Sequence, residues 1–150
     1  TQTDGSKARM IEWLKTTPRA VLVATASFWE GVDVPGEALR LVVIDKIPFA
    51  QPTPVQKARE AALGKRSFDD LVVPDATLAL KQGFGRLIRT RTDRGVVAIL
   101  DPRMINEAYG RRIVAALPDA QVVMTVAEVE AFYAAHGASE EEHITVPFVA

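Results

Sequence analysis

Three short apolar runs rich in valine, isoleucine and leucine constrain the fold more than any other feature of this sequence. They cover residues 20–23, 41–44 and 96–100, and residues 121–124 form a weaker fourth run. The three stronger runs do not alternate between apolar and polar residues, which is typical of central strands whose two faces are both buried. The sequence therefore predicts a mainly parallel sheet.

Helical patterns fall around and between these runs. We expect helices over residues 6–15, 55–63, 74–89, 106–117 and 125–137. Pro74 is suited to a first helical turn, and Thr125 with Glu128 forms a capping box. Strands that alternate with helices indicate an α/β fold with right-handed crossovers.

Composition narrows the class of protein. The chain has 150 residues, 48% of them hydrophobic, which suits one domain with one core. A formal charge of −1 argues against a protein that coats nucleic acid by bulk charge. With no cysteine and two histidines, the chain cannot build an iron–sulfur cluster or a structural zinc site. No apolar run approaches the ~18 residues of a membrane span, and no signal peptide is evident, so we expect a cytoplasmic protein without a membrane partner.

The helix expected over residues 74–89 has two chemically different sides. At about 100° per residue, one stripe carries Gln82, Arg86 and Arg89. The opposite side, which we expect to face the core, carries Leu80, Phe84 and Leu87. Guanidinium groups match phosphate oxygens in a bidentate fashion, so the stripe is suited to a phosphoryl group. A solvated basic face is the other interpretation of this pattern.

Two glycines inside the same helix favour the phosphate interpretation. Gly83 and Gly85 each cost about 1 kcal/mol relative to alanine in a helix interior. An ordinary surface helix has no reason to carry both. Close approach of another backbone or of a ligand would explain them.

The loop over residues 25–36 follows the first predicted strand and carries polar groups, including Glu30 and Asp33. Ligands bind at the carboxyl edge of open α/β sheets, so this loop is a candidate binding segment. The alternative is a plain turn in which Phe28 and Trp29 pack as a lid.

Two of these segments resemble motifs of known proteins. SFWEGVDVPG at residues 27–36 resembles motif V of superfamily 2 helicases in the form used by the DinG/XPD family. QGFGRLIR at residues 82–89 resembles motif VI, KIPF at 46–49 resembles the segment that links them, and 97–103 resembles the strand and Asp-x-Arg that follow. Together these segments cover residues 21–117, and the resemblance implies an ATP-dependent DNA helicase of the bacterial DinG type with 5′-to-3′ polarity.

The resemblance also implies roles for individual residues. Arg86 and Arg89 would be catalytic arginine fingers that reach the γ-phosphate of ATP held by a partner domain. The ATP-binding positions implied are Gln82, Gly85, Glu30, Gly31 and Asp33. Thr25 and Ser27 would bind single-stranded DNA, and no metal ligand is implied.

A complete helicase also needs a phosphate-binding P-loop, and this sequence contains none. We therefore expect the second, C-terminal RecA-like domain of a longer chain, a three-layer α/β domain over residues 1–138 that is truncated at its N-terminal side. Residues 139–150 are expected to form a tail. Its partners would be single-stranded DNA and the N-terminal RecA-like domain, which would bind most of the ATP and Mg²⁺. The cysteines for an iron–sulfur cluster would belong to that other half.

Two other functions remain open from the sequence. One is a non-catalytic α/β module that binds phosphate or a nucleotide, in which the arginine stripe docks a partner. The other is a stand-alone enzyme for small molecules, although no nucleophile–base pair or metal cluster stands out.

Overall fold

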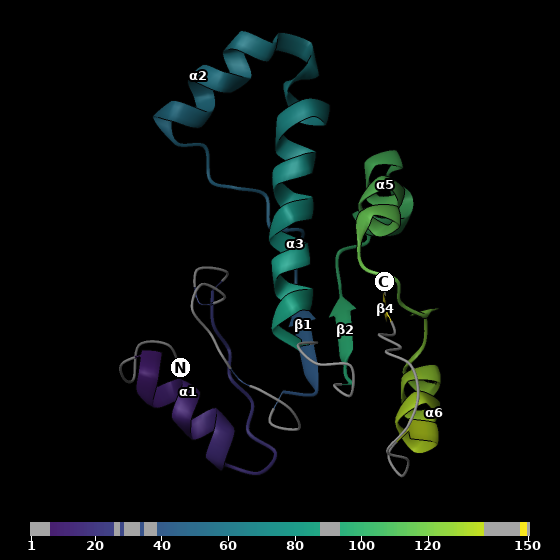
Figure 1. The fold of residues 1–150 in the computed structure, drawn as a ribbon. Helices are drawn as coiled ribbons and strands as arrows, with labels where there is room; N and C mark the ends of the chain where they lie inside the picture. Colours follow the sequence, from purple (N-terminus) through teal and green to yellow (C-terminus); the bar gives the residue numbers. More distant parts are fainter. Residues whose placement is uncertain are drawn as a thin grey trace.

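The computed structural model describes residues 7–25, 28, 34, 39–87, 94–136 and 148–149 (Figure 1). Within these residues, four parallel strands form one sheet in the order β1-β2-β4-β3. The strands are β1 (Leu41–Ile44), β2 (Val96–Ile99), β3 (Val122–Val123) and β4 (Phe148–Val149). The helices are α1 (Lys7–Thr16), α2 (Pro54–Leu63), η3 (Gly64–Arg66), η4 (Phe68–Val72), α3 (Val73–Leu87), α4 (Arg103–Asn106), α5 (Ala108–Ala116) and α6 (Val126–His136).

The longest strand pairing in the sheet joins β1 and β2. Leu41 pairs with Val96 and Ile44 with Ile99 in parallel register, and the crossover between the two strands contains α3. The predicted strands over 41–44, 96–100 and 121–124 correspond to β1, β2 and β3. The prediction of an α/β fold with a parallel sheet is therefore confirmed.

The main core lies between one face of β1 and β2 and the helices α3, α4 and α5. Its buried members include Ile44, Val97 and Ile99 from the strands. From the helices come Leu80, Phe84, Leu87, Met104 and Ile113. The prediction that the apolar side of the helix over 74–89 faces the core is confirmed.

The crossover from β1 to β2 includes helix α2, an arm that stands away from the sheet (Figure 1). Helix α2 has no buried residue, and its first turn is capped by Thr53, whose side chain accepts a hydrogen bond from the Gln56 N–H at 3.2 Å. The short η3 and η4 helices then lead directly into α3. Helix α3 begins one residue before Pro74, and its described part ends at Leu87.

The helix expected over 106–117 is divided into two in the structure. Helix α4 begins earlier, at Arg103, and α5 starts after Glu107 has adopted an extended conformation. A Cβ atom at Gly110 would lie 2.2 Å from the Arg103 carbonyl oxygen and 2.4 Å from that of Met104. Glycine is required there because the first turn of α5 rests against the backbone of α4.

The prediction of a buried strand over residues 20–23 is wrong. These residues pair with no strand that the structure describes, and Val21 and Val23 expose 78% and 75% of their surfaces. Ala20 and Leu22, in contrast, pack against a second, small cluster made by Met10, Leu14, Phe28 and Val34. An apolar run signals burial, but here only every second side chain is covered, because the segment lies along one small cluster instead of inside the sheet.

The structure also differs from the expected tail at two residues. Phe148–Val149, within the range 139–150, forms β4 and pairs with both β2 and β3. A two-residue strand is too short to produce a recognisable apolar pattern, so the sequence carries little signal for it. The position at which the domain ends along the chain stays a prediction.

Helix α6 begins with the expected capping box. The Glu128 carboxylate accepts hydrogen bonds from the Thr125 N–H at 2.9 Å and from the Thr125 hydroxyl at 2.7 Å, and the Glu128 N–H donates to Thr125 Oγ1 at 3.3 Å. The Thr125 hydroxyl is the main cause that holds the pKa of Glu128 below its usual value, and the N–H groups of Met124 and Thr125 assist. The Tyr133 hydroxyl donates to the Arg40 carbonyl oxygen at 2.5 Å, which ties α6 to the start of β1.

Candidate functional site

The last turns of α3 present a polar face to the outside of the domain. Gln82 and Gly85 are exposed, and Arg86 is half-buried with its Nε atom enclosed. Leu80, Phe84 and Leu87, on the other side of the helix, are at most 2% exposed. The core therefore fixes the rotation of α3, and this rotation directs Gln82 and Gly85 outwards.

Gly85 has no neighbour among the described residues that requires a glycine. A Cβ atom there would meet no heavy atom within 4 Å among the residues that the structure describes, whereas Gly83 is buried. Because glycine costs about 1 kcal/mol in a helix interior, an open glycine is consistent with close approach from outside the domain.

The end of α3 lies at the amino end of the sheet. A Cβ atom at Gly95, just before β2, would lie 2.7 Å from a Leu87 side-chain atom and 2.8 Å from the carbonyl oxygen of Arg40, just before β1. The polar face of α3 is therefore remote from the carboxyl ends of the strands, where ligands of open α/β sheets usually bind.

Only part of the loop over residues 25–36 is described. Thr25 is exposed, and its carbonyl oxygen accepts a hydrogen bond from the Phe28 N–H at 2.8 Å. Phe28 and Val34 are 4% and 2% exposed and anchor the loop on the second cluster. The remaining candidate residues, Ser27, Glu30, Gly31, Asp33 and Arg89, lie outside the described residues.

A dense polar network at the carboxyl end of the sheet was not assigned a role from the sequence. Asp101, which follows β2, is 3% exposed. Its carboxylate accepts hydrogen bonds from the Ile47 N–H at 2.9 Å, the Arg103 N–H at 3.0 Å and the Arg103 guanidinium at 2.6 Å. The Arg103 side chain is the main cause that holds the pKa of Asp101 well below its usual value of 3.8, with the backbone donors assisting against the opposing effect of burial.

The same network extends to an aromatic cluster. The Arg103 guanidinium lies 5.4 Å from the centre of the Phe49 ring, and Phe49 packs against Phe68 and Tyr109 at 5.9 and 6.1 Å. The Asp-x-Arg pattern directly after a strand was the signal in the sequence. What the sequence could not show is that this Asp reaches a backbone N–H 54 residues away.

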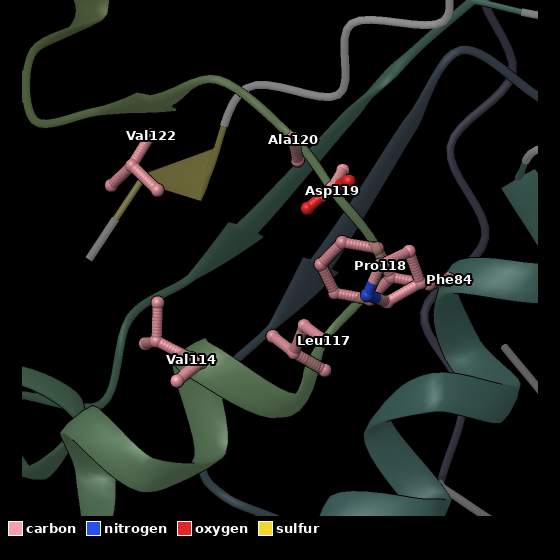
Figure 2. A pocket seen from close by; sticks show the side chains of 8 residues that line it. Phe84, Val114, Leu117, Pro118, Asp119, Ala120 and Val122 are labelled. Carbon is pink, nitrogen blue, oxygen red and sulfur yellow. The ribbon is translucent and has the colours of Figure 1, made fainter.

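Two hollows of the described surface differ in size: one of about 360 Å³ is lined by residues of α3 and α5 such as Lys81 and Arg112, and the other is smaller. Figure 2 shows a pocket of about 130 Å³ between α3 and the segment after α5, lined mostly by apolar side chains such as Phe84 and Leu117. Ligand sites usually enclose about 300–1,000 Å³. No group of three or more His, Cys, Asp or Glu side chains that could hold a metal ion occurs in the described ranges. Within those ranges, none of the helices has the length and apolar character that a membrane crossing demands.

Known proteins match most of this chain. The family model of the helicase C-terminal domain matches residues 1–120. The chain is 44% identical over 137 residues to the ATP-dependent DNA helicase YoaA of Escherichia coli. The matched segment covers 89% of this chain and 22% of YoaA. It is 40% identical over 137 residues to the 3′-5′ exonuclease DinG of Bacillus subtilis, covering 88% and 15% of the two chains. It is 46% identical over 121 residues to the ATP-dependent helicase DinG of Mycobacterium tuberculosis, covering 78% and 18%.

The chain thus spans less than a quarter of the length of these relatives. The matched range includes the loop over 25–36, the polar face of α3 and the Asp101 network. On this match and these relatives, the chain belongs to the family of helicase C-terminal domains, of the DinG-like type.

Proposed function

We propose that this chain is the C-terminal motor domain of an ATP-dependent DNA helicase. It completes an ATP site on an N-terminal RecA-like domain of the same protein and takes part in binding single-stranded DNA. In this proposal the domain has the three-layer RecA-like architecture, and the whole protein unwinds DNA with 5′-to-3′ polarity.

The observation that carries the proposal is the outer face of α3. A helix packed on the core by one side presents Gln82, the open Gly85 and the half-buried Arg86 on the other. We propose that Arg86 acts with Arg89 on the γ-phosphate, since charge stabilisation and positioning provide most of the catalysis of phosphoryl transfer. Gln82 and Gly85 would lie against the nucleotide.

The loop after Thr25 completes the proposed site. Glu30, Gly31 and Asp33 would couple the nucleotide to DNA, and Thr25 and Ser27 would contact the DNA backbone. Among the described residues of this segment, the exposed position of Thr25 supports its contact with DNA, and Phe28 packs in the second cluster.

The cofactors fit this division of labour. A guanidinium and an amide suit phosphate oxygens, so this chain can contribute to binding ATP. Following the resemblance to complete helicases, we assign Mg²⁺ to the N-terminal domain. Because the sequence has no cysteine, any iron–sulfur cluster would also be held outside this chain.

The test replaces Arg86 in the full-length protein. Arg86→Ala should lower ATP hydrolysis stimulated by single-stranded DNA by about 10³–10⁵-fold, because an arginine finger contributes that much. Arg86→Lys keeps the charge and the aliphatic stem but loses the bidentate fork, so it should also be severely impaired while its melting temperature stays close to the parent value.

The matched control is Arg111→Lys on the exposed side of α5, which should hydrolyse ATP at the parental rate. Parental turnover in both Arg86 variants would refute the finger assignment. A parent protein that binds nucleotide but shows no DNA-stimulated turnover would favour the non-catalytic phosphate-binding module instead.

A further inference from the structure

The loop that leaves the carboxyl end of β1, residues 45–50, is held unusually firmly. Before it, the Ile44 carbonyl oxygen accepts a hydrogen bond from the Leu100 N–H at 2.9 Å. Within it, Ile47 is 4% exposed and belongs to the main core, and Phe49 packs in the aromatic cluster. Between these anchors, Lys46 has an exposed side chain at the edge of the sheet.

Asp101 provides the anchor nearest to Lys46. The N–H that it accepts at 2.9 Å belongs to Ile47, and this N–H is part of the peptide group that joins Lys46 to Ile47. Asp101 is itself held by the N–H and the guanidinium of Arg103. The carboxylate therefore fixes the orientation of the peptide from which Lys46 projects.

Holding a connecting loop with a buried carboxylate carries a large desolvation cost. Removing a carboxylate from water costs several kcal/mol, which excellent hydrogen-bond geometry is needed to offset. Asp101 is the one buried charged side chain among the residues that the structure describes. Such a device is expected where a neighbouring group must be placed accurately, because a lysine on a fixed backbone loses less freedom when it binds.

We propose that Lys46 binds a phosphate group at the carboxyl end of the sheet and that Asp101 is the residue that positions it. The cation is suited to a phosphate of the DNA backbone or of a nucleotide. This inference rests on the proposed motor function, which provides both DNA and a nucleotide as sources of a phosphate group. The polar face of α3 lies at the opposite, amino end of the strands, so Lys46 would act separately from Arg86.

The experiment measures binding by the full-length protein carrying Lys46→Gln, Asp101→Asn or both changes. The probes are a fluorescent oligothymidine and a fluorescent ATP analogue, each titrated at several salt concentrations. Lys46→Gln should weaken one of the two probes by about tenfold, as expected for the loss of a charge-assisted hydrogen bond. If that probe is the DNA, the plot of log K against log salt should become less steep, its negative slope shrinking in magnitude by about 0.7.

The positioning role is tested by the double variant. Asp101→Asn should weaken the same probe, and the double variant should bind no more weakly than the poorer single variant, because both changes disable one contact. Effects that multiply would show that Asp101 does not act through Lys46 and would overturn its role. The control is Lys57→Gln on the exposed arm helix α2, which should bind both probes like the parent.

Other outcomes are equally decisive. Lys46→Gln that binds both probes with parental affinity would overturn the phosphate site. If Asp101→Asn fails to fold, Arg103→Gln replaces it, since it removes the guanidinium that holds the carboxylate in position for Ile47. It should then weaken the same probe as Lys46→Gln, and parental binding of both probes would overturn the positioning role. A parent protein without ATP turnover would refute the motor function, while the binding of the two probes would still decide this proposal.

Discussion

The two ends of the β1–β2 pair differ in how they are closed. At the carboxyl end, Asp101 links Ile47 and Arg103 through hydrogen bonds, and Arg103 lies over Phe49. At the amino end, α3 finishes with an open glycine at position 85 on its outer side. The carboxyl end therefore satisfies the buried Asp101 within the domain, whereas at the amino end no described residue lies within 4 Å of a Cβ atom at Gly85. In the proposed function, the carboxyl end holds a loop in place and the amino end receives a partner.

The largest expected effect on stability concerns the inner side of α3. It tests whether one side of this helix is buried in the core while the other side faces outwards. Leu87→Ala should lower the free energy of unfolding by about 2–5 kcal/mol, because Leu87 is 2% exposed and truncation leaves a cavity. Urea unfolding followed by circular dichroism measures the loss. Leu78 on the same helix is 57% exposed, so Leu78→Ala should stay within about 0.5 kcal/mol of the parent. Equal losses in the two variants would mean that α3 is rotated.

The next effect tests the closed, carboxyl end. Asp101→Asn should lower the free energy of unfolding at pH 7 by about 1–3 kcal/mol, because it weakens buried hydrogen bonds to a charged group. The pKa of Asp101 lies below 3.8 in the folded protein, so the stabilisation by the carboxylate is present above that value and is lost as the pH falls below it. Unfolding curves from pH 7 to pH 2 should therefore show the parent and Asp101→Asn converging in acid.

Asp119→Asn serves as the matched comparison, because Asp119 is exposed at the rim of the pocket in Figure 2. It should differ little from the parent across the same pH range. A constant gap between the parent and Asp101→Asn at all pH values would show that the charge of Asp101 is not what closes this end.

The smallest effect sharpens the description of the amino end. Gly85→Ala should raise the stability of the domain by up to about 1 kcal/mol, since the helix gains propensity and the new Cβ meets no described neighbour. If the outer face of α3 receives a partner domain or a nucleotide, the same methyl group should lower DNA-stimulated ATP turnover in the full-length protein. A variant that is more stable and fully active would show that nothing approaches this position.

Much of the fold could be predicted from the sequence because its signals are local. The apolar runs over 41–44 and 96–100, the inner side of α3 and the capping box of Thr125 with Glu128 are patterns within a few residues, and the structure confirms them. The failures involve partners that are distant in sequence. Residues 20–23 have a strand-like composition, but whether a run becomes a strand depends on a neighbouring backbone.

The candidate site divides in the same way. The outward direction of Gln82 and Gly85 follows from helical periodicity, which the core residues of α3 establish. The role of Asp101 could not be inferred, since it depends on the loop around Ile47 being brought to the end of β2 by the whole crossover. The roles of Arg86 in phosphoryl transfer and of Thr25 in DNA binding stay predictions.

The strand order also sets a sequence of events during synthesis. β4 lies between β2 and β3 in the sheet, yet it is the last of the four strands along the chain. Domains begin to fold while the ribosome adds about 5–20 residues per second, so β1 and β2 can pair long before residues 148–149 exist. Until then, one side of β2 and both sides of β3 are unpaired edges that can join a foreign strand. The nascent protein is therefore most exposed to aggregation in the interval between the completion of β3 and the arrival of β4.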